Sequence, residues 1–255
     1  MRRLVAAVLA FFFTACACGG ERPLCVVGSS SMGKALRTLA AASPYPIEVQ
    51  LGGTQQGLAA LAEGRADLAA CSRALTPADG EVEPTVLALD AIAVVVNDEN
   101  PFTAIDSDVL RAVYEGEITD WNTLGCTLGR IVVIGRETGS GTRASFENAI
   151  GIRKPAHGQE LGEDGIVCTA VSSCPRAIGY VSAACEAEGI HPLLLDGSAI
   201  SQETVQSGTY PLVRPFLLCA DGTDERAEAF LVWATGEEGR TLLRSIGLFE
   251  PQERQ

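Results

Sequence analysis

The feature that most constrains the fold is a strand-to-helix junction of small polar residues, which occurs three times. Each junction follows a short apolar run and precedes apolar residues at helical spacing, so each predicts a strand that turns directly into a helix. The alternation indicates an α/β fold, in which such junctions lie at the ligand-binding edge of the sheet. The junctions are Gly28-Ser-Ser-Ser-Met-Gly33, Gly52-Gly-Thr-Gln-Gln-Gly57 and Gly135-Arg-Glu-Thr-Gly-Ser-Gly-Thr142.

The third junction has the chemistry of an anion site. Gly139-Ser140-Gly141-Thr142 is expected at a helix N-terminus, where the first backbone N–H groups lack intrahelical partners and the helix dipole is positive. The glycines allow close approach, the hydroxyls add donors, and Arg136 offers a fork of donors that fits an oxyanion. A strand over residues 66–71 delivers Ser72 and Arg73 to the same edge.

Other interpretations of these junctions are weaker. A single Ser/Thr-Gly junction is more often an ordinary helix cap, and only the repetition favours a site. A P-loop needs a Lys-Ser/Thr pair after its glycine, and this loop has none. The dinucleotide fingerprint needs its glycines directly after the strand, whereas residues 136–139 intervene here. A nucleophile elbow needs Gly-x-Ser-x-Gly, but the loop reads Thr138-Gly-Ser-Gly-Thr142.

The composition allows one large domain or two small ones and argues against a nucleic-acid partner. Of the 255 residues 47% are hydrophobic, so the chain can bury a sizeable core. With 19 basic and 32 acidic residues the net charge is −13, which repels nucleic acid. An anionic ligand is repelled at long range too, so its binding must rest on short-range dipoles and one or two local cations.

The first fifteen residues have the pattern of an export leader. Arg2-Arg3 precedes an apolar stretch over residues 4–13 that is too short to span a bilayer, and Thr14-Ala15 forms a small-residue cleavage site. Phe13-Thr-Ala-Cys16 resembles a bacterial lipoprotein signal, in which Cys16 becomes the lipidated N-terminus; the alternatives are Cys18 or an ordinary secretory signal. We expect an exported chain with a tether over residues 16–23, held on a membrane face by a lipid.

The chain carries nine cysteines, an unusual number. Setting Cys16 aside leaves an even set in a compartment that permits disulfides, and a local bridge between Cys168 and Cys174 is plausible. We interpret Cys25 and Cys71 as small buried apolar residues in strands. With only two histidines and no C-x-x-C, a metal site is not expected, and no cofactor is expected either.

Four segments together resemble the substrate-binding proteins of phosphate ABC transporters, in particular their shorter lipoprotein branch. The segments are Gly28-Ser-Ser-Ser-Met32, Gly53-Thr-Gln-Gln-Gly57 with the following 63–68, Tyr114-Glu-Gly-Glu-Ile-Thr-Asp-Trp-Asn122, and Gly135-Arg-Glu-Thr-Gly-Ser-Gly-Thr-Arg143; residues 177–181 and 207–215 also look like that family. The resemblance implies a two-lobed α/β periplasmic-binding-protein fold of type II, with discontinuous domains joined by two crossing strands. We expect lobe I to cover residues 24–92 and 214–255, and lobe II residues 93–213.

The resemblance also implies a function without chemistry. An inorganic phosphate ion would bind in the cleft between the lobes and be handed to a membrane ABC permease. The protein would be a monomer in the periplasm or cell envelope. Alternatives from the same cleft are a binding protein for sulfate or molybdate, or a phosphate sensor or scavenger. A competing class is an exported hydrolase or phosphatase with Ser140 as nucleophile and His157 or His191 as base.

Carried over residue by residue, the resemblance implies contacts from both lobes: Ser30 through its hydroxyl, Ser31 through its backbone N–H, Thr54 where the family uses Ser, and Arg136, Gly139, Ser140, Gly141 and Thr142 from lobe II. Two positions depart from the family. Ser72 stands where the better-known members carry an Asp that accepts a hydrogen bond from protonated phosphate, which leaves discrimination against sulfate open. Thr138 stands where an acid commonly pairs with the arginine, and Glu137 could substitute for it.

Overall fold

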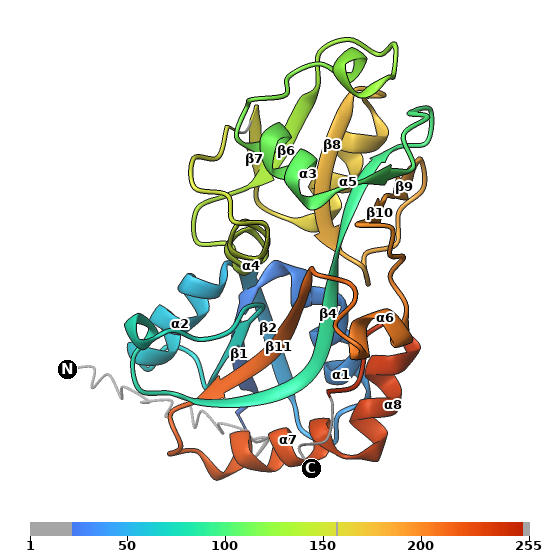
Figure 1. Cartoon of the computed structure of the whole chain (residues 1–255). Helices are drawn as coiled ribbons and strands as arrows, with labels where there is room; N and C mark the ends of the chain where they lie inside the picture. Colours follow the sequence, from blue (N-terminus) through green and yellow to red (C-terminus); the bar gives the residue numbers. More distant parts are fainter. Residues whose placement is uncertain (1–21, 157, 252–255) are drawn as a thin grey trace, which may run out of the picture.

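The protein folds into two α/β lobes stacked end to end, as Figure 1 shows for the computed structural model. The structure describes residues 22–156 and 158–251. The predicted leader and Cys16 therefore lie outside the described residues. In the part of the chain that is described, no helix is both long enough and apolar enough to cross a membrane.

Lobe I contains the first and the last elements of the chain. Its strands are β1 (Leu24–Ser29), β2 (Ile47–Gly52) and β3 (Leu68–Cys71), with β1 parallel to both of the others. They are covered by α1 (Gly33–Ala42), α2 (Thr54–Ala62), α7 (Glu225–Thr235) and α8 (Glu237–Ser245). A short 3-10 helix, η1 (Ser30–Met32), joins β1 to α1, and a second, η2 (Pro77–Asp79), follows β3.

Lobe II is built around a second group of strands. β6 (Val132–Arg136) lies parallel to both β7 (Gln159–Leu161) and β8 (Ala177–Ser182). The helices are α3 (Ser107–Tyr114), α4 (Gly141–Ile150) and α5 (Asp164–Ser172), with the 3-10 helix η3 (Trp121–Leu124). The remaining elements are β5 (Ala104–Ile105), β9 (Ile190–Pro192), β10 (Leu194–Leu195) and α6 (Gln202–Gln206).

Two long strands cross between the lobes and make one continuous sheet. β4 (Glu83–Asn97) pairs antiparallel with β11 (Val213–Ala220) up to Ala91, and from Ile92 onward it pairs with β8. The sheet order is β2-β1-β3-β11-β4-β8-β6-β7, with β9 beside β4. The predicted two-lobed architecture with two crossing strands is therefore confirmed. The proposed lobe boundaries at 92/93 and 213/214 stay a prediction.

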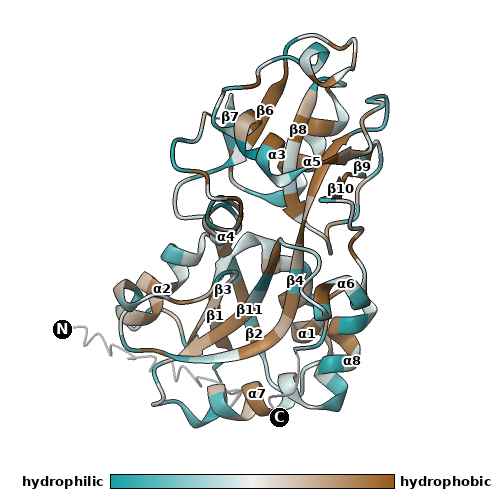
Figure 2. Ribbon diagram, in the orientation of Figure 1, coloured by the Kyte–Doolittle hydropathy of each residue, from teal (hydrophilic) through white to brown (hydrophobic). Residues whose placement is uncertain are grey.

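Each lobe has its own apolar core, and the strands that line it are the brown segments of Figure 2. In lobe II the core surrounds Trp121, Tyr114 and Phe146, all fully buried. In lobe I the core lies between the sheet and the faces of α1 and α7, around Leu36 and Phe230. Burying these apolar faces is the main stabilising contribution of each lobe.

The polar residues 151–165 contain β7 and the start of α5. The segment is polar because β7 is an edge strand with little core contact. At the end of the chain, Gly236 has an extended backbone and separates α7 from α8.

Candidate anion-binding site between the lobes

The three strand-to-helix junctions predicted from the sequence exist, and each ends a parallel strand. β1 leads into η1 and α1, β2 into α2, and β6 through a short loop into α4. Thr54 is the first residue of α2, and Gly141 is the first residue of α4. Ser140 caps α4, since its Oγ accepts a hydrogen bond from the backbone N of Arg143 at 3.3 Å. The junctions thus place the free N–H groups of helix N-termini beside hydroxyl side chains.

The junctions of the two lobes meet at the cleft. The backbone N of Gln55, in lobe I, lies 3.5 Å from the carbonyl oxygen of Gly139 in lobe II. A Cβ added to Gly141 would lie 2.3 Å from Oγ1 of Thr54 and 2.4 Å from Oγ of Ser72. Because no side chain fits at that distance, glycine is required where α4 approaches lobe I. The predicted residues Thr54, Ser72, Gly139 and Gly141 are therefore brought together.

Arg136 supplies the buried cation of the site. It ends β6, and only 1% of its surface is exposed. Its Nη2 donates to Oγ of Ser30 in lobe I at 3.0 Å, and its Nη1 lies 3.4 Å from Oγ1 of Thr142. Two backbone carbonyls fix the rest of the guanidinium: Nε donates to Leu161 at 3.1 Å and Nη2 to Gly162 at 2.6 Å. The guanidinium is thus held in one orientation with one edge turned toward the hydroxyls.

A chain of serine hydroxyls lines the lobe I side. Oγ of Ser29 lies 2.9 Å from Oγ of Ser31 and 2.7 Å from Oγ of Ser72, and all three residues are buried. The backbone N of Ser72 donates to Oγ1 of Thr54 at 3.2 Å. Ser30 is half-buried and donates its own hydroxyl to the carbonyl of Gly162 at 3.2 Å. Sequence reasoning did not single out Ser29, although the run of three serines was the signal for it.

The acidic partner of Arg136 is Asp164, which the sequence analysis did not predict. The carboxylate of Asp164 accepts a hydrogen bond from Nη1 of Arg136 and, at 2.9 Å, one from the backbone N of Ser182. The predicted substitute, Glu137, is only at 4.0 Å from Nη2 of Arg136 and is partly exposed. Asp164 begins α5 at the end of a polar stretch of the sequence, so its position in the sequence gave no signal.

A second buried ion pair lies below the site on the crossing strands. Arg214 of β11 donates from Nη2 to Oδ2 of Asp90 of β4 at 2.7 Å, and both side chains are almost fully buried. Ser182 donates to the other oxygen of Asp90 at 2.8 Å, and Nη1 of Arg214 lies 3.4 Å from the carbonyl of Ser72. Burial raises the pKa of Asp90 to about 6, although Arg214 and Ser182 lower it. Through its contact with the carbonyl of Ser72, Arg214 helps to fix the backbone there.

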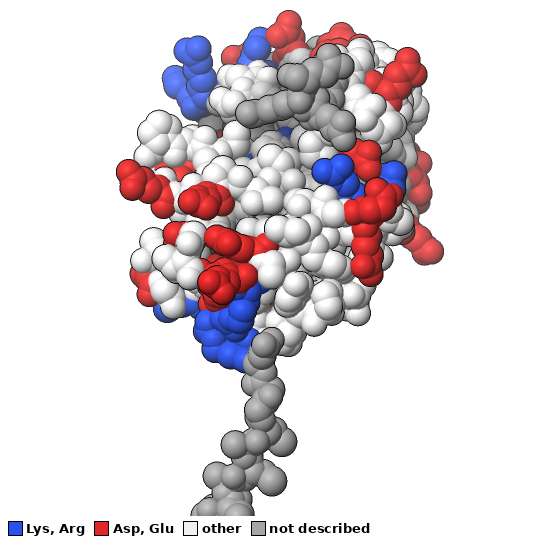
Figure 3. Space-filling model, turned by 90° about the horizontal axis from the view of Figure 1, so that it is seen from below, with Lys and Arg blue, Asp and Glu red and all other residues white. Residues whose placement is uncertain are grey.

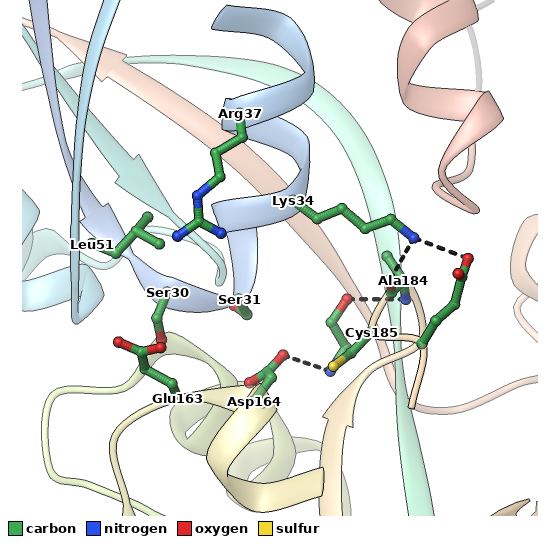
Figure 4. A pocket seen from close by; sticks show the side chains of 12 residues that line it. Ser30, Ser31, Lys34, Arg37, Leu51, Glu163, Asp164, Ala184 and Cys185 are labelled. Atoms are coloured by element: carbon green, nitrogen blue, oxygen red, sulfur yellow. Dashed lines mark hydrogen bonds and ion pairs between the residues drawn. The ribbon is translucent and has the colours of Figure 1, made fainter. Parts of the chain in front are cut away.

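Among the described residues, three cavities open at the cleft. One, of about 360 Å³, is lined by Ser30 and Ser31 together with Lys34 and Arg37 of α1 and the acids that face them across the opening (Figure 4). A second, of about 470 Å³, lies between Gly53 and Gly139, and a third, of about 270 Å³, lies between Gln55 and Ser140. The chain has a net charge of −13, and on the face shown in Figure 3 acidic and basic side chains lie in separate small groups. Attraction of an anion therefore depends on the groups inside the cleft.

The arrangement suits a small oxyanion and offers little to other chemistry. Helix N-termini, hydroxyls and one guanidinium are donors for a tetrahedral anion. Within residues 22–156 and 158–251, no group of three His, Cys, Asp or Glu side chains could hold a metal ion. His191, one of the two candidate bases, contacts the carbonyl of Phe102 at 2.9 Å and Asp98 instead of Ser140. The other candidate base, His157, lies outside the described residues.

Comparison with known proteins agrees with this geometry. Residues 20–238 match a family described as the PBP superfamily domain. The phosphate-binding protein PstS of Bacillus subtilis is 30% identical over 203 residues, which cover 74% of this chain and 67% of that protein. This chain belongs to the phosphate-binding proteins of ABC transporters. Members of this family are substrate-binding proteins of transporters and not enzymes, so the hydrolase alternative is excluded.

Solved structures of similar proteins support the same assignment. A phosphate ABC transporter substrate-binding protein from Clostridium perfringens, with bound phosphate, superposes with a TM-score of 0.87 at 26% identity, covering 91% of this chain and 100% of that one. An ABC-type phosphate transport receptor from Vibrio cholerae superposes with a TM-score of 0.75 at 28% identity, covering 89% and 100%. The phosphate-binding protein fold expected from the sequence is therefore confirmed. Which residues contact a ligand stays a prediction.

Proposed function

We propose that this protein binds inorganic phosphate in the cleft between its lobes and delivers it to an ABC permease on the outer side of the cytoplasmic membrane. The observation that supports the proposal is that donors from the two lobes meet at two places: the guanidinium of Arg136 in lobe II contacts the hydroxyl of Ser30 in lobe I, and Gly141 of α4 lies against the hydroxyl of Thr54 in lobe I. A binding protein whose ligand bridges two lobes closes by hinge motion around that ligand.

The proposed ligand contacts fall into three groups by their chemistry. Backbone N–H groups come from the N-terminal turns at Ser31 and at residues 139–142; hydroxyls come from Ser30, Thr54, Ser72, Ser140 and Thr142; the single charge comes from Arg136. Because Asp164 compensates most of that charge, the anion is held mainly by neutral donors in a site with little water. Such donors are worth more there than they are in water.

Selectivity among oxyanions follows from Ser72. The Ser72 hydroxyl lies at the end of the serine chain, where it contacts Ser29 and can either donate or accept a hydrogen bond. A hydroxyl accepts a weaker hydrogen bond from protonated phosphate than a carboxylate does, and it does not repel fully ionised sulfate. We therefore propose that phosphate is the preferred ligand. Sulfate and related oxyanions bind at the same place, and their affinity is lower than that of phosphate by a smaller factor than in a site with an aspartate at position 72.

Attachment to the cell envelope is a separate proposal. The leader pattern before Cys16 supports export followed by lipidation of that cysteine, which would leave residues 16–23 as a tether to lobe I. We propose that the protein works as a monomer, because one chain supplies both halves of the cleft. Mass spectrometry of the membrane fraction tests the anchor, since lipidation adds acyl chains to the N-terminal peptide.

The test of the binding function is isothermal titration calorimetry of the purified protein with phosphate, sulfate and molybdate. We expect one phosphate ion per chain and weaker binding of the other two ions. No heat with any of the three ions at micromolar protein would overturn the proposal. Tighter binding of sulfate or molybdate would keep the site and change the substrate. Growth on limiting phosphate after deletion of the gene separates uptake from sensing, since only uptake is needed for growth.

A further inference from the structure

Two pairs of cysteines lie in contact in this structure, and neither pair is the one expected from sequence spacing. Sγ of Cys168 is 3.4 Å from Sγ of Cys185, and Sγ of Cys71 is 3.7 Å from Sγ of Cys219. The expected bridge between Cys168 and Cys174 is not formed, and all seven cysteines of the described residues carry free thiols. A disulfide brings the sulfurs to about 2 Å, so each pair needs only a small movement to bond.

The two pairs differ in access. Cys71 and Cys219 are completely buried on neighbouring strands, and they are diagonal neighbours because Cys71 pairs with Leu217 and Cys219 with Ala69. In contrast, Cys185 follows β8 at the surface of lobe II, is partly exposed and lines the 360 Å³ cavity (Figure 4). A dissolved reagent can therefore reach the Cys168–Cys185 pair, and it cannot reach the buried pair.

The surroundings of Cys185 make it more reactive than Cys168. The two sulfurs share a hydrogen bond, which lowers the pKa of Cys185 and raises that of Cys168. Burial and the carboxylate of Asp164 oppose the lowering at Cys185, and the charge of Lys34 on α1 favours it. Because the thiolate is the nucleophile in disulfide exchange, the more exposed of the two cysteines is also the more reactive one.

We propose that Cys168 and Cys185 are a dithiol pair that closes to a disulfide and fixes α5 to the turn after β8. The oxidant is a disulfide compound. The Cys185 thiolate attacks one of its sulfurs, which releases a thiolate and leaves Cys185 as a mixed disulfide. The Cys168 thiol then loses its proton and attacks the Cys185 sulfur, which releases the second thiolate. The protein loses two electrons and two protons, and the oxidant becomes two thiols.

The bond reinforces the part of lobe II that positions Arg136. Asp164, the first residue of α5, already accepts a hydrogen bond from the backbone N of Ser182 at the end of β8. Cys168 lies one helical turn after Asp164, so a bond to Cys185 joins the same helix to the same turn a second time. The same turn also contacts lobe I, since Nζ of Lys34 donates to the carbonyl of Ala184 at 3.1 Å and to Glu186 at 3.0 Å.

The test is direct and needs no substitution. The protein is purified with a reductant, the reductant is replaced by oxidised glutathione, and free thiols are alkylated before proteolysis and mass spectrometry. We expect a Cys168–Cys185 cross-linked peptide that disappears after reduction. Because a bond across this loop restricts the unfolded chain, we expect oxidation to raise the melting temperature by about 5 °C or more.

Two matched variants test whether the cross-link and the rise in melting temperature come from the Cys168–Cys185 pair. Cys174→Ser is expected to retain the cross-linked peptide and the rise in melting temperature, whereas Cys185→Ser is expected to lose both. Alkylation of both Cys168 and Cys185 in the oxidised wild-type protein would overturn the proposal. A cross-link between Cys168 and Cys174 would overturn it as well.

Discussion

Arg136 and Asp164 form a buried ion pair at the floor of the cleft, with Nη1 of the guanidinium donating to the carboxylate. The two residues come from β6 and from the first turn of α5, and a second carboxylate oxygen is held by the backbone N of Ser182. The carboxylate therefore fixes the direction of the guanidinium, and the remaining Nη2 reaches Ser30 of the opposite lobe. One ion pair thus links the position of the cation to the closure of the cleft.

Replacing Arg136 by alanine should weaken phosphate binding by about 3 kcal/mol, or roughly a hundredfold, because a buried charge-assisted contact is lost. The matched control is Arg111→Ala, which removes the same charge from a partly exposed arginine that forms an ion pair with Asp108 on α3. Calorimetry on both variants checks the prediction. If Arg136→Ala binds phosphate as wild type does, the site lies elsewhere.

Asp164→Asn separates positioning of the arginine from contact with the ligand. The amide leaves one of the two donors, Arg136 or Ser182, without its acceptor, so we expect a loss of about 1–3 kcal/mol in the free energy of unfolding. Phosphate affinity should stay within tenfold of wild type, because the negative charge next to the anion is removed at the same time. Chemical denaturation and calorimetry give the two values. A loss of affinity as large as that of Arg136→Ala would contradict this prediction, and it would mean that the charge of Asp164 is needed to hold Arg136 in its binding position.

Gly141→Ala should prevent full closure of the cleft. The added Cβ would lie 2.3 Å from Oγ1 of Thr54 and 2.4 Å from Oγ of Ser72, so the lobes must stay further apart. We expect phosphate affinity to fall at least tenfold while the melting temperature of the ligand-free protein changes little, since alanine suits the first turn of α4. Gly165→Ala is the control, because a Cβ there meets nothing within 4 Å. Equal affinities in the two variants would contradict the closed geometry.

Ser72→Asp should sharpen the selectivity of the site. An aspartate next to Ser29 would accept the proton of phosphate and repel sulfate, so the ratio of the two affinities should rise at least tenfold above that of the wild type. Competition titrations with both ions measure the ratio. An unchanged ratio would show that Ser72 does not face the ligand.

The buried pair on the crossing strands predicts a pH dependence of stability. The pKa of Asp90 is about 6 in the folded protein, against an ordinary value of 3.8. Between these two pH values, Asp90 is protonated in the folded state and ionised in the unfolded state. The contribution of Asp90 to the free energy of unfolding is therefore lost as the pH rises from 4 to 7, by roughly 3 kcal/mol. Urea denaturation of wild type and Asp90→Asn over this range isolates the effect. A difference between the two proteins that does not change with pH would contradict it, and a rise with pH would mean that Arg214 lowers the pKa of Asp90 overall.

Much of the site could be predicted from the sequence because its parts are local. A run of β-branched residues, a glycine and a hydroxyl residue suffice to predict the starts of α2 and α4, where Thr54 and Ser140 lie. The resemblance of several segments to one family then placed these starts in a common cleft. The two crossing strands were expected from the same resemblance, and both are largely apolar because most of their residues are buried.

The parts that were missed depend on contacts between distant segments. Asp164 lies in a polar stretch, and only the folded chain brings it beside Arg136. The Asp90–Arg214 pair joins two strands more than a hundred residues apart, and a charged residue in an apolar strand carries no sign of its partner. For the same reason sequence spacing favoured Cys174 as the partner of Cys168, whereas the structure places Cys185 there.

The most direct test of the account is a crystal structure of the protein grown with phosphate. We expect a single tetrahedral ion within hydrogen-bonding distance of Ser30, Thr54, Arg136 and Ser140, with the lobes closed over it. A phosphate ion bound away from these four residues, or a cleft that stays empty at saturating phosphate, would contradict it.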